Sequence, residues 1–265
     1  SKHGDIPGRH GSHGGHFRDG VDAGGIDMIY IPPWQMKKTG VKAGTLAVGS
    51  TVKLMEGGTA VEYLVVNQGI PENSSLYDAS CNGTWLLRKD IHSNREWNSA
   101  NVNKYESSPI NTWLNGDYFN SLGTVEQATI KQVKIPYRKD GGEGGTDQSG
   151  ANGLLCKVFL LGGYEVGCTT SDDQNFPQDG AKLSYFESGI GTSANNKRIA
   201  KLYGSAANWW LRSPRASHTS YVWYVYSSGS PDGNLTPNSY GIRPALILPS
   251  NALFDKTTML LKGVK

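Results

Sequence analysis

Two apolar stretches near the C-terminus, Asn208-Trp209-Trp210-Leu211-Arg212-Ser213-Pro214 and Gly241-Ile242-Arg243-Pro244-Ala245-Leu246-Ile247-Leu248, decide which fold this chain can adopt. Each is a nearly continuous run of aromatic and aliphatic residues, which is the pattern of a central strand in a sheet. Each also contains one arginine, and an arginine on a central strand is rarely fully buried unless it is paired. We therefore expect Arg212 and Arg243 to bond carboxylates or loop carbonyls, with Asp232 as one candidate partner.

The segment between these stretches, residues 215–240, which we call the window, contains no Lys, Glu, Gln or Met. At ordinary usage these four types fill roughly a fifth of positions, so chance leaves such a gap only about once in a hundred. Tyr and Ser are abundant instead, above all in residues 217–228. Antibody-like binding loops have this composition, because Tyr supplies contact area and Ser supplies adaptable hydrogen bonds. The window is therefore predicted to be an exposed recognition surface.

Residues 221–226 are expected to form a strand, in which alternate side chains point to opposite faces. One face of this strand carries Tyr221, Trp223 and Val225, and the other face carries Val222, Tyr224 and Tyr226. We assign Trp223 and Val225 to the interior, so Tyr224 and Tyr226 are expected to point to solvent. The polar residues that follow, 228–240, predict a turn and a second exposed loop. An ordinary polar hairpin is the alternative interpretation of the same pattern.

The binding region, which the resemblance described below implies is variable, is placed at about residues 208–248. The predicted ligand-binding residues are Arg215, Ser217, His218, Thr219, Ser220, Tyr221, Tyr224, Tyr226, Ser228, Ser230, Asp232, Asn234, Thr236, Asn238 and Tyr240. The predicted scaffold beneath them is Trp209, Trp210, Arg212, Trp223, Val225, Gly241 and Arg243. No catalytic residue, metal ligand or cofactor is predicted.

The two framing stretches resemble the C-type lectin fold domains of phage and prophage proteins, whose last third has the pattern WWLRSP…GxRPAL. They are most similar to the variable proteins of diversity-generating retroelements, which phages use as tail-tip receptor-binding proteins. The resemblance covers roughly residues 44–248 and includes Trp113-Leu114-Asn115, although the first two thirds match only loosely. It implies an α+β fold with two helices, a small mixed sheet and long irregular loops.

The resemblance also implies how the window varies and what it does. Randomised Asn codons yield Tyr, Ser, Asn and other small or polar residues but never Lys, Glu, Gln, Met or Trp, so Trp223 is expected to be fixed scaffold. The implied function is non-enzymatic binding of a host cell-surface protein or glycan at the tip of a phage tail fibre. The protein would be made in the bacterial cytoplasm and assembled with other virion tail proteins. Display on a bacterial surface is the alternative location, and a homotrimer would gain avidity.

The first 43 residues are expected to be a tether or fibre-attachment segment, followed by a ligand-binding domain over residues 44–265. The tether is rich in Gly and His, and His10, His13 and His16 lie three residues apart. Such rows could bind a metal around the axis of a trimer, and a linker is the alternative. The short segment 29–34 is expected to be extended and docked on a neighbouring surface.

Helices and strands are also expected in the first part of the domain. Ser108 is a natural N-cap with Pro109 at the first helical position. A second helix is expected over residues 124–133 and a short polar one over residues 194–202. Strands are expected at 51–54, 61–66, 85–88 and 154–161, with a turn at Gly57-Gly58.

Composition excludes several classes of protein. The chain has 265 residues, of which 18% are charged, and a net charge of +3 without a basic stripe; this composition argues against nucleic acid as a partner. The apolar runs are too short to span a bilayer. Three cysteines without a CxxC pair predict buried free thiols, with a Cys156–Cys168 bridge as the alternative.

An enzyme on the same fold and a fixed structural protein of the virion are the rival hypotheses. Formylglycine-generating enzymes end in a similar Gly-aromatic-Arg run but require two cysteines near that end, and this chain has none after Cys168. His92 lies near Asp90 and Glu96 without a nucleophile or a metal-ligand spacing, so a polar surface loop is expected there.

Overall fold

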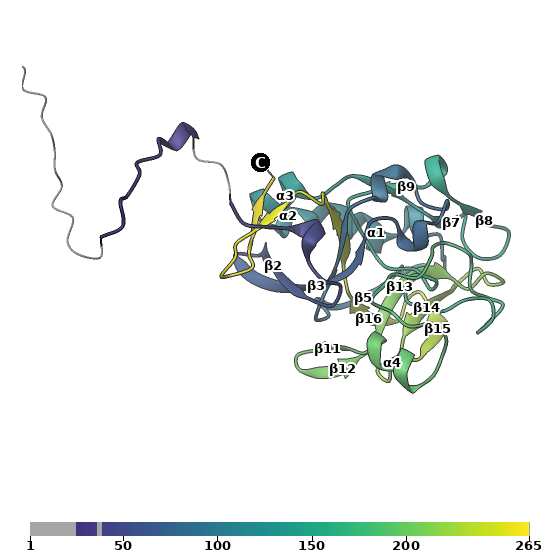
Figure 1. Cartoon of the computed structure of the whole chain (residues 1–265). Coiled ribbons are helices and arrows are strands. Elements are labelled where there is room, and N and C mark those ends of the chain that lie inside the picture. Colours follow the sequence, from purple (N-terminus) through teal and green to yellow (C-terminus); the bar gives the residue numbers. More distant parts are fainter. Residues whose placement is uncertain (1–24, 36–38, 265) are drawn as a thin grey trace, which may run out of the picture. The chain divides into compact units, whose positions relative to one another are not determined.

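The computed structural model describes residues 25–35 and 39–264 of the chain (Figure 1). The chain divides into two units, residues 1–37 and 38–265. In the first unit, the described residues are extended up to a 3-10 turn, Pro33–Gln35, and their large apolar side chains are exposed. The docking of segment 29–34 therefore stays a prediction, and His10, His13 and His16 lie outside the described residues.

The second unit begins slightly earlier than residue 44, because strand β1 (Val41–Lys42) pairs with β18 (Leu253–Phe254) near the C-terminus. One of its two five-stranded sheets is entirely antiparallel, in the order β10–β17–β4–β3–β2. Gly57 and Gly58 have positive φ angles of 57° and 78°, so the predicted turn between β2 and β3 is confirmed. The strands are β2 (Thr51–Glu56), β3 (Thr59–Gln68), β4 (Thr84–Arg88), β10 (Val158–Phe159) and β17 (Ala245–Leu248).

The other five-stranded sheet has the order β15–β14–β13–β16–β5 and contains most of the window. Its β13–β16 pair is parallel and its other pairs are antiparallel. Figure 1 shows β13, β14 and β15 side by side, with α4 near the β14–β15 hairpin. The strands are β5 (Ser93–Glu96), β13 (Trp209–Pro214), β14 (Tyr221–Val225), β15 (Pro231–Leu235) and β16 (Ser239–Ile242).

Smaller sheets complete the β structure. They are β1 (Val41–Lys42) with β18 (Leu253–Phe254) and β19 (Leu261–Gly263), β6 (Val133–Ile135) with β9 (Leu154–Cys156), β7 (Tyr137–Lys139) with β8 (Thr146–Gln148), and β11 (Ala200–Leu202) with β12 (Ser205–Ala207). The predicted strand at 154–161 is thus divided between β9 and β10.

The predicted first helix is confirmed: the Ser108 hydroxyl accepts a hydrogen bond from the backbone N–H of Asn111. It consists of α1 (Pro109–Trp113), a π-helical turn (Leu114–Tyr118) and α2 (Phe119–Ser121) in succession. The next two helices, α3 (Thr124–Thr129) and α4 (Thr192–Arg198), are shorter than predicted. Each ends before a residue run that pairs as a strand instead, β6 after α3 and β11 after α4.

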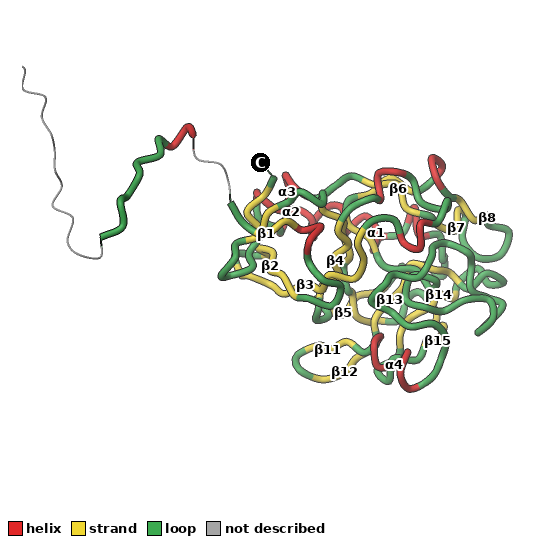
Figure 2. The backbone as a smooth tube through the Cα atoms, viewed as in Figure 1, coloured by secondary structure: helices red, strands yellow, loops and turns green. Residues whose placement is uncertain are grey.

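The expected α+β C-type lectin fold with two helices and one small mixed sheet is wrong. The part of the chain that the structure describes is β-rich, with nineteen short strands in several sheets and few helices (Figure 2). The framing stretches do form strands, β13 and β16–β17, but a strand motif specifies local conformation and not the sheet into which the strand pairs. Here the second framing stretch divides between the two large sheets, β16 in one and β17 in the other.

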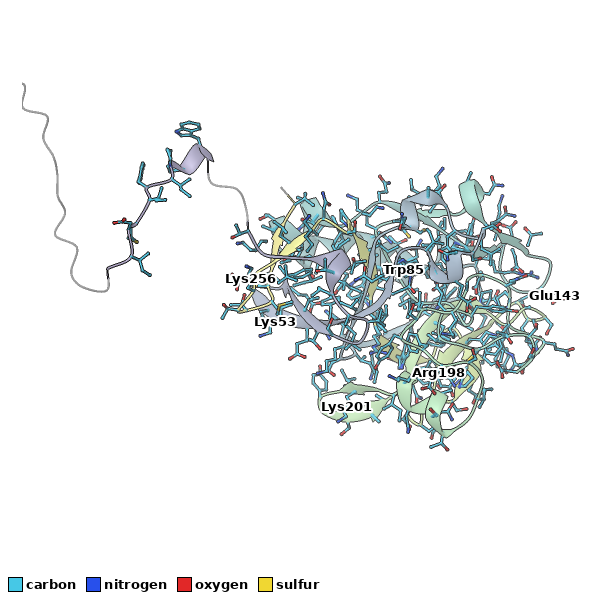
Figure 3. All side chains as sticks on the ribbon, in the orientation of Figure 1. Lys53, Trp85, Glu143, Arg198, Lys201 and Lys256 are labelled. Carbon is cyan, nitrogen blue, oxygen red and sulfur yellow. The ribbon has the colours of Figure 1, made fainter. Side chains whose placement is uncertain are left out.

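A single aromatic and aliphatic core fills the second unit. Trp85 lies in its interior, edge-on to Tyr77 and Phe159 at centroid distances of 5.6 and 5.5 Å. In Figure 3 the side chain of Trp85 lies in the densely filled middle, whereas those of Glu143 and Lys201 lie at the rim. All three cysteines are buried as free thiols, so the alternative Cys156–Cys168 bridge is not formed.

Candidate functional site

The inward residues of the window are fixed by aromatic stacking. The Trp223 ring stacks on Phe176 with a centroid distance of 3.8 Å and an interplanar angle of 12°, and only 3% of its surface is exposed. Its indole N–H donates to the Asn175 carbonyl over 2.9 Å, and the Arg215 guanidinium lies 4.9 Å from the ring centroid. Val225 is fully buried. The predicted inward assignment of Trp223 and Val225 is therefore confirmed.

Arg212 is the centre of a buried polar network. Its guanidinium forms an ion pair with Glu165, and both side chains are completely buried. It also donates to the carbonyls of Pro136, Leu160 and Asp179 at 3.1, 2.8 and 2.7 Å. A buried ion pair is tolerated only when further hydrogen bonds satisfy its remaining donors, as they do here. The expectation that Arg212 is structural and bonded to a carboxylate and loop carbonyls is confirmed.

Asp179 is a second buried carboxylate in the same network. Its Oδ2 accepts a hydrogen bond from the Ser213 hydroxyl over 2.7 Å, while Oδ1 has no partner among the described residues. Burial raises the pKa of Asp179 to about 7, although Arg212 and the Ser213 hydrogen bond act in the opposite direction. Asp179 therefore holds its proton to a much higher pH than an ordinary carboxyl group.

Arg243 is also buried, but its environment contains less charge. Its Nε donates to the Arg88 carbonyl over 2.8 Å, and its guanidinium lies 5.0 Å from the centroid of the Trp209 ring. Its Nη1 has no partner in the part of the chain that the structure describes. Burial lowers the pKa of Arg243 to about 10. The candidate partner Asp232 lies elsewhere, where its carboxylate accepts from the Tyr224 hydroxyl over 3.3 Å.

The remaining predicted scaffold residues are buried as well, namely Trp209, Trp210 and Gly241. Position 241 requires a glycine because neighbouring atoms pack closely against its backbone: a Cβ there would lie 2.6 Å from both the Asn208 carbonyl oxygen and the Ile91 side chain. The Trp210 indole N–H donates to the Arg95 carbonyl over 2.9 Å.

Tyr224 does not point to solvent as predicted, since only 5% of its surface is exposed. Its ring packs against Tyr240, with a centroid distance of 4.5 Å, and against Trp210 at 6.1 Å. The alternation along β14 is correct, but the outward face of the sheet is covered by its own aromatic side chains. Thr236 is buried too, and its hydroxyl donates to the Ala100 carbonyl over 2.6 Å. Both residues are therefore structural.

The other predicted ligand-binding residues reach the surface to different degrees. The exposed ones are Ser217, Thr219, Tyr226, Ser228 and Asp232. The half-buried ones are Arg215, His218, Ser220, Tyr221, Ser230, Asn234, Asn238 and Tyr240. The prediction of an exposed surface thus holds for the loops of the window and fails for the strand between them.

These residues form three patches, not one. On the outward face of the sheet, the Asn234 amide donates to the Tyr240 hydroxyl over 2.6 Å, and the Asn238 amide donates to Asn234 Oδ1 over 3.1 Å. At the start of β14, residues 215–221 form a loop whose Arg215 lies 3.6 Å from Asp173. At the far end of β14, the tip 226–230 is held to α4 through a 2.8 Å hydrogen bond from Arg198 Nε to the Gly229 carbonyl.

Arg95 and Trp113 belong beside this surface, although neither was predicted. Arg95 lies opposite Tyr240 in the β5–β16 ladder, and its guanidinium is 4.3 Å from the centroid of the Trp113 ring. Both residues lie more than a hundred positions before the window, so no local pattern connects them with it.

Three side chains that could take part in enzyme chemistry are buried or half-buried, namely Cys81, Cys168 and His92. Burial raises the pKa of the Cys81 thiol to about 12 and that of Cys168 to about 11. Burial lowers the pKa of His92, whose ring packs edge-on against Trp113 and Tyr118. Among residues 25–35 and 39–264, no group of three or more His, Cys, Asp or Glu side chains is placed to hold a metal ion.

Residues 82–250 match a family model described as Domain of unknown function (DUF6273). The matched residues begin just before β4 and end just after β17, and include both framing stretches and the whole window. Comparisons with curated proteins and with solved structures gave no match. Within the described residues, none of the helices has the length and apolar character needed to cross a membrane.

Proposed function

The chain belongs to the DUF6273 family of domains of unknown function. We propose that it is a non-enzymatic binding protein whose window contacts the ligand. The observation that carries the proposal is that some residues of the window are buried and others are exposed. Val222, Trp223 and Val225 are buried and immobilised, whereas Ser217, Thr219, Tyr226, Ser228 and Asp232 are exposed. Rigid anchoring beneath exposed Tyr, Ser and Asp side chains reduces the entropy lost on binding.

The proposed ligand is a protein or glycan on a host cell surface, bound by the chain at the tip of a phage tail fibre or on a bacterial surface. This finer part of the proposal is supported by the composition of the window. Tyr226, with 49% of its surface exposed, supplies the largest outward aromatic area of the window. Individual contacts of this kind are weak, so several copies of the chain would bind more tightly through avidity.

Sequencing the coding region and its flanking DNA in several isolates tests the proposal. We expect differences concentrated at the five exposed positions predicted to bind ligand, constancy at Val222, Trp223 and Val225, and a nearby near-copy repeat with a reverse transcriptase. A window that does not vary among isolates, or variation spread evenly over exposed and buried positions, would contradict it.

A further inference from the structure

The helix that contains α1 and α2 has an irregular turn in its middle. Residues Leu114–Tyr118 form a π-helical turn between the two α-helical parts. Such turns are rare in helices and occur frequently at functional sites, because the extra residue displaces the side chains around it. Here the displaced turn contains Gly116, which leaves the surface open, and Asp117, whose side chain is exposed.

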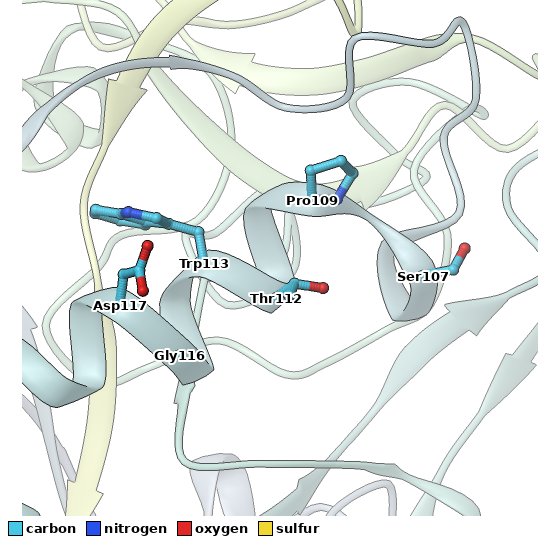
Figure 4. A pocket seen from close by; sticks show the side chains of 6 residues that line it. All are labelled: Ser107, Pro109, Thr112, Trp113, Gly116 and Asp117. Atoms are coloured by element: carbon cyan, nitrogen blue, oxygen red, sulfur yellow. The ribbon is translucent and has the colours of Figure 1, made fainter.

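A hollow of about 470 Å³ lies on one flank of this helix, lined by Ser107, Pro109, Thr112, Trp113, Gly116 and Asp117 (Figure 4). Figure 4 shows the carboxylate of Asp117 beside the indole of Trp113, while the side chain of Thr112 points away from both. The Arg95 guanidinium lies over the indole, 4.3 Å from its centroid, and the rings of His92 and Tyr118 pack against it at 5.3 and 5.4 Å, so the indole is held in place. Asp117 makes no hydrogen bond or ion pair with any described residue, so its carboxylate is available to a ligand.

A second hollow of about 460 Å³ lies on the other flank and shares Thr112 with the first. Side-chain amides dominate its lining, from Asn111, Asn115, Asn120 and Gln132. Asn115 is fully occupied, since its amide donates to the Val158 carbonyl over 2.9 Å and its oxygen accepts from the Lys157 backbone N–H over 2.8 Å. This fixes the floor of the hollow. Asn120 and Gln132 have no side-chain hydrogen bond within the described residues.

We propose that this face of the helix is a saccharide-binding site, separate from the window. A sugar ring presents an apolar C–H face, which packs on an aromatic ring such as Trp113, and hydroxyls, which bond carboxylates and amides such as Asp117 and Asn120. Both hollows have volumes in the range of about 300–1,000 Å³ that small-ligand sites occupy. Because they share Thr112, a short oligosaccharide lying across the helix contacts both.

The charge of the site favours a neutral sugar over a phosphate or another anion. Asp117 would repel an anion in the first hollow. The ammonium of Lys157, in the second, already lies 4.7 Å from the centroid of the Phe119 ring. The site shares no residue with the window, so it stands whether or not the window binds the same ligand.

The test is calorimetric titration of the full chain with the tetrasaccharides of β1,4-linked glucose, α1,4-linked glucose, β1,4-linked mannose and β1,4-linked N-acetylglucosamine. We expect at least one to bind, and Trp113→Ala to abolish that binding. Asp117→Asn and Asn120→Ala, at exposed positions that do not support the fold, should each weaken it by about tenfold, which is a loss of about 1.4 kcal/mol. Tyr203→Ala, at a side chain 92% exposed on the β11–β12 hairpin, is the matched control and should leave binding unchanged.

Two results would overturn the proposal. One is that none of the four tetrasaccharides binds the unaltered chain. The other is that Asp117→Asn and Asn120→Ala bind as tightly as the unaltered chain. If binding is lost only in Tyr226→Ala, the sugar occupies the window, which supports the proposed function and rejects this second site.

Discussion

The two five-stranded sheets of the molecule are held in different ways. In the β10–β17–β4–β3–β2 sheet, the central strands are buried through aliphatic side chains such as Leu86, Leu87 and Leu246. In the sheet that contains the window, the central strand β13 instead buries Arg212 and Ser213, which bond Glu165 and Asp179. Apolar packing is not directional, whereas a hydrogen-bonded network specifies one arrangement of the groups it joins.

The buried network of the second sheet explains how the window is positioned. The segment that bonds Arg212 and Ser213, residues 160–179, also includes Asn175 and Phe176, which hold Trp223. The buried network thus fixes the layer on which the window rests, without contacting the exposed side chains. Fold stability and recognition are therefore expected to depend on different residues of this one sheet.

Breaking the buried ion pair is expected to have the largest effect. Glu165→Gln removes the carboxylate that is ion-paired with the buried Arg212 guanidinium, and breaking such a buried pair costs about 3–5 kcal/mol. Urea denaturation measures this as a fall in the transition midpoint. The matched control is Glu62→Gln, which removes an ion pair with Lys89 whose side chains are 47% and 50% exposed. Exposed pairs contribute about 1 kcal/mol or less, so equal losses in the two variants would contradict the account.

Protonation of Asp179 gives a second contrast between the sheets, because the acid of the ion pair on the β10–β17–β4–β3–β2 sheet, Glu56 with Arg88, has a lowered pKa, whereas that of Asp179 is raised. The folded-state pKa of about 7 lies above the ordinary value of 3.8, so the folded chain retains a proton that the unfolded chain releases. The stability that this retained proton adds to the folded state is fully present below about pH 4 and is lost as the pH rises through 7. One pKa unit corresponds to about 1.4 kcal/mol, which limits the effect to about 4 kcal/mol. The charged groups that act on Asp179 are Arg212, Glu165 and Asp147.

Asp179→Asn should therefore flatten the dependence of unfolding free energy on pH between 4 and 7. The measurement is urea denaturation at several pH values across this interval. Asp232→Asn, at an exposed position, is the control and should follow the unaltered chain. An unchanged slope in Asp179→Asn would show that this carboxylate is already ionised in the folded protein.

Trp223→Phe is expected to have a smaller effect on stability. It keeps a ring that can stack on Phe176 but removes the indole N–H that donates to the half-buried Asn175 carbonyl. That carbonyl still accepts from the Ala216 backbone N–H over 2.8 Å, so the loss is one hydrogen bond, about 0.5–1.5 kcal/mol. Thermal unfolding followed by circular dichroism checks this. A variant as stable as the parent would mean that Trp223 does not anchor the window.

Tyr226→Ala should leave stability unchanged to within about 0.5 kcal/mol, because half of this side chain is exposed and it supports no buried contact. Its expected effect is on adsorption to cells, which should weaken. Adsorption equal to that of the unaltered chain, in a protein of unchanged stability, would favour a fixed structural role in the virion.

Local features were predictable from the sequence because their determinants are local. Ser108 and Pro109 specify the start of a helix within three residues, and the apolar run around Trp209 and Trp210 predicts a central strand. Which acid pairs with Arg212 was not predictable, because Glu165 lies 47 positions away and no local pattern joins them.

The errors have related causes. Alternation along residues 221–226 assigns side chains to two faces of a strand, but it does not show that Tyr240, from β16, packs against Tyr224. The fold class was wrong because the framing stretches specify strands and not their neighbours, and β16 and β17 pair into separate sheets. Arg95 was missed for the same reason, since only the β5–β16 pairing brings it beside Tyr240, and Trp113 of α1 joins it through the contact between its ring and the Arg95 guanidinium.

The most direct test is a library in which only the exposed window positions that are predicted to bind ligand are randomised. These are Ser217, Thr219, Tyr226, Ser228 and Asp232, with Val222, Trp223 and Val225 kept. The library is displayed on yeast and sorted for protease resistance and then for binding to labelled lysozyme, a target unrelated to the chain. We predict that most members resist protease as well as the parent and that binders of lysozyme emerge. Loss of resistance in most members, or a folded library without binders, would contradict the account.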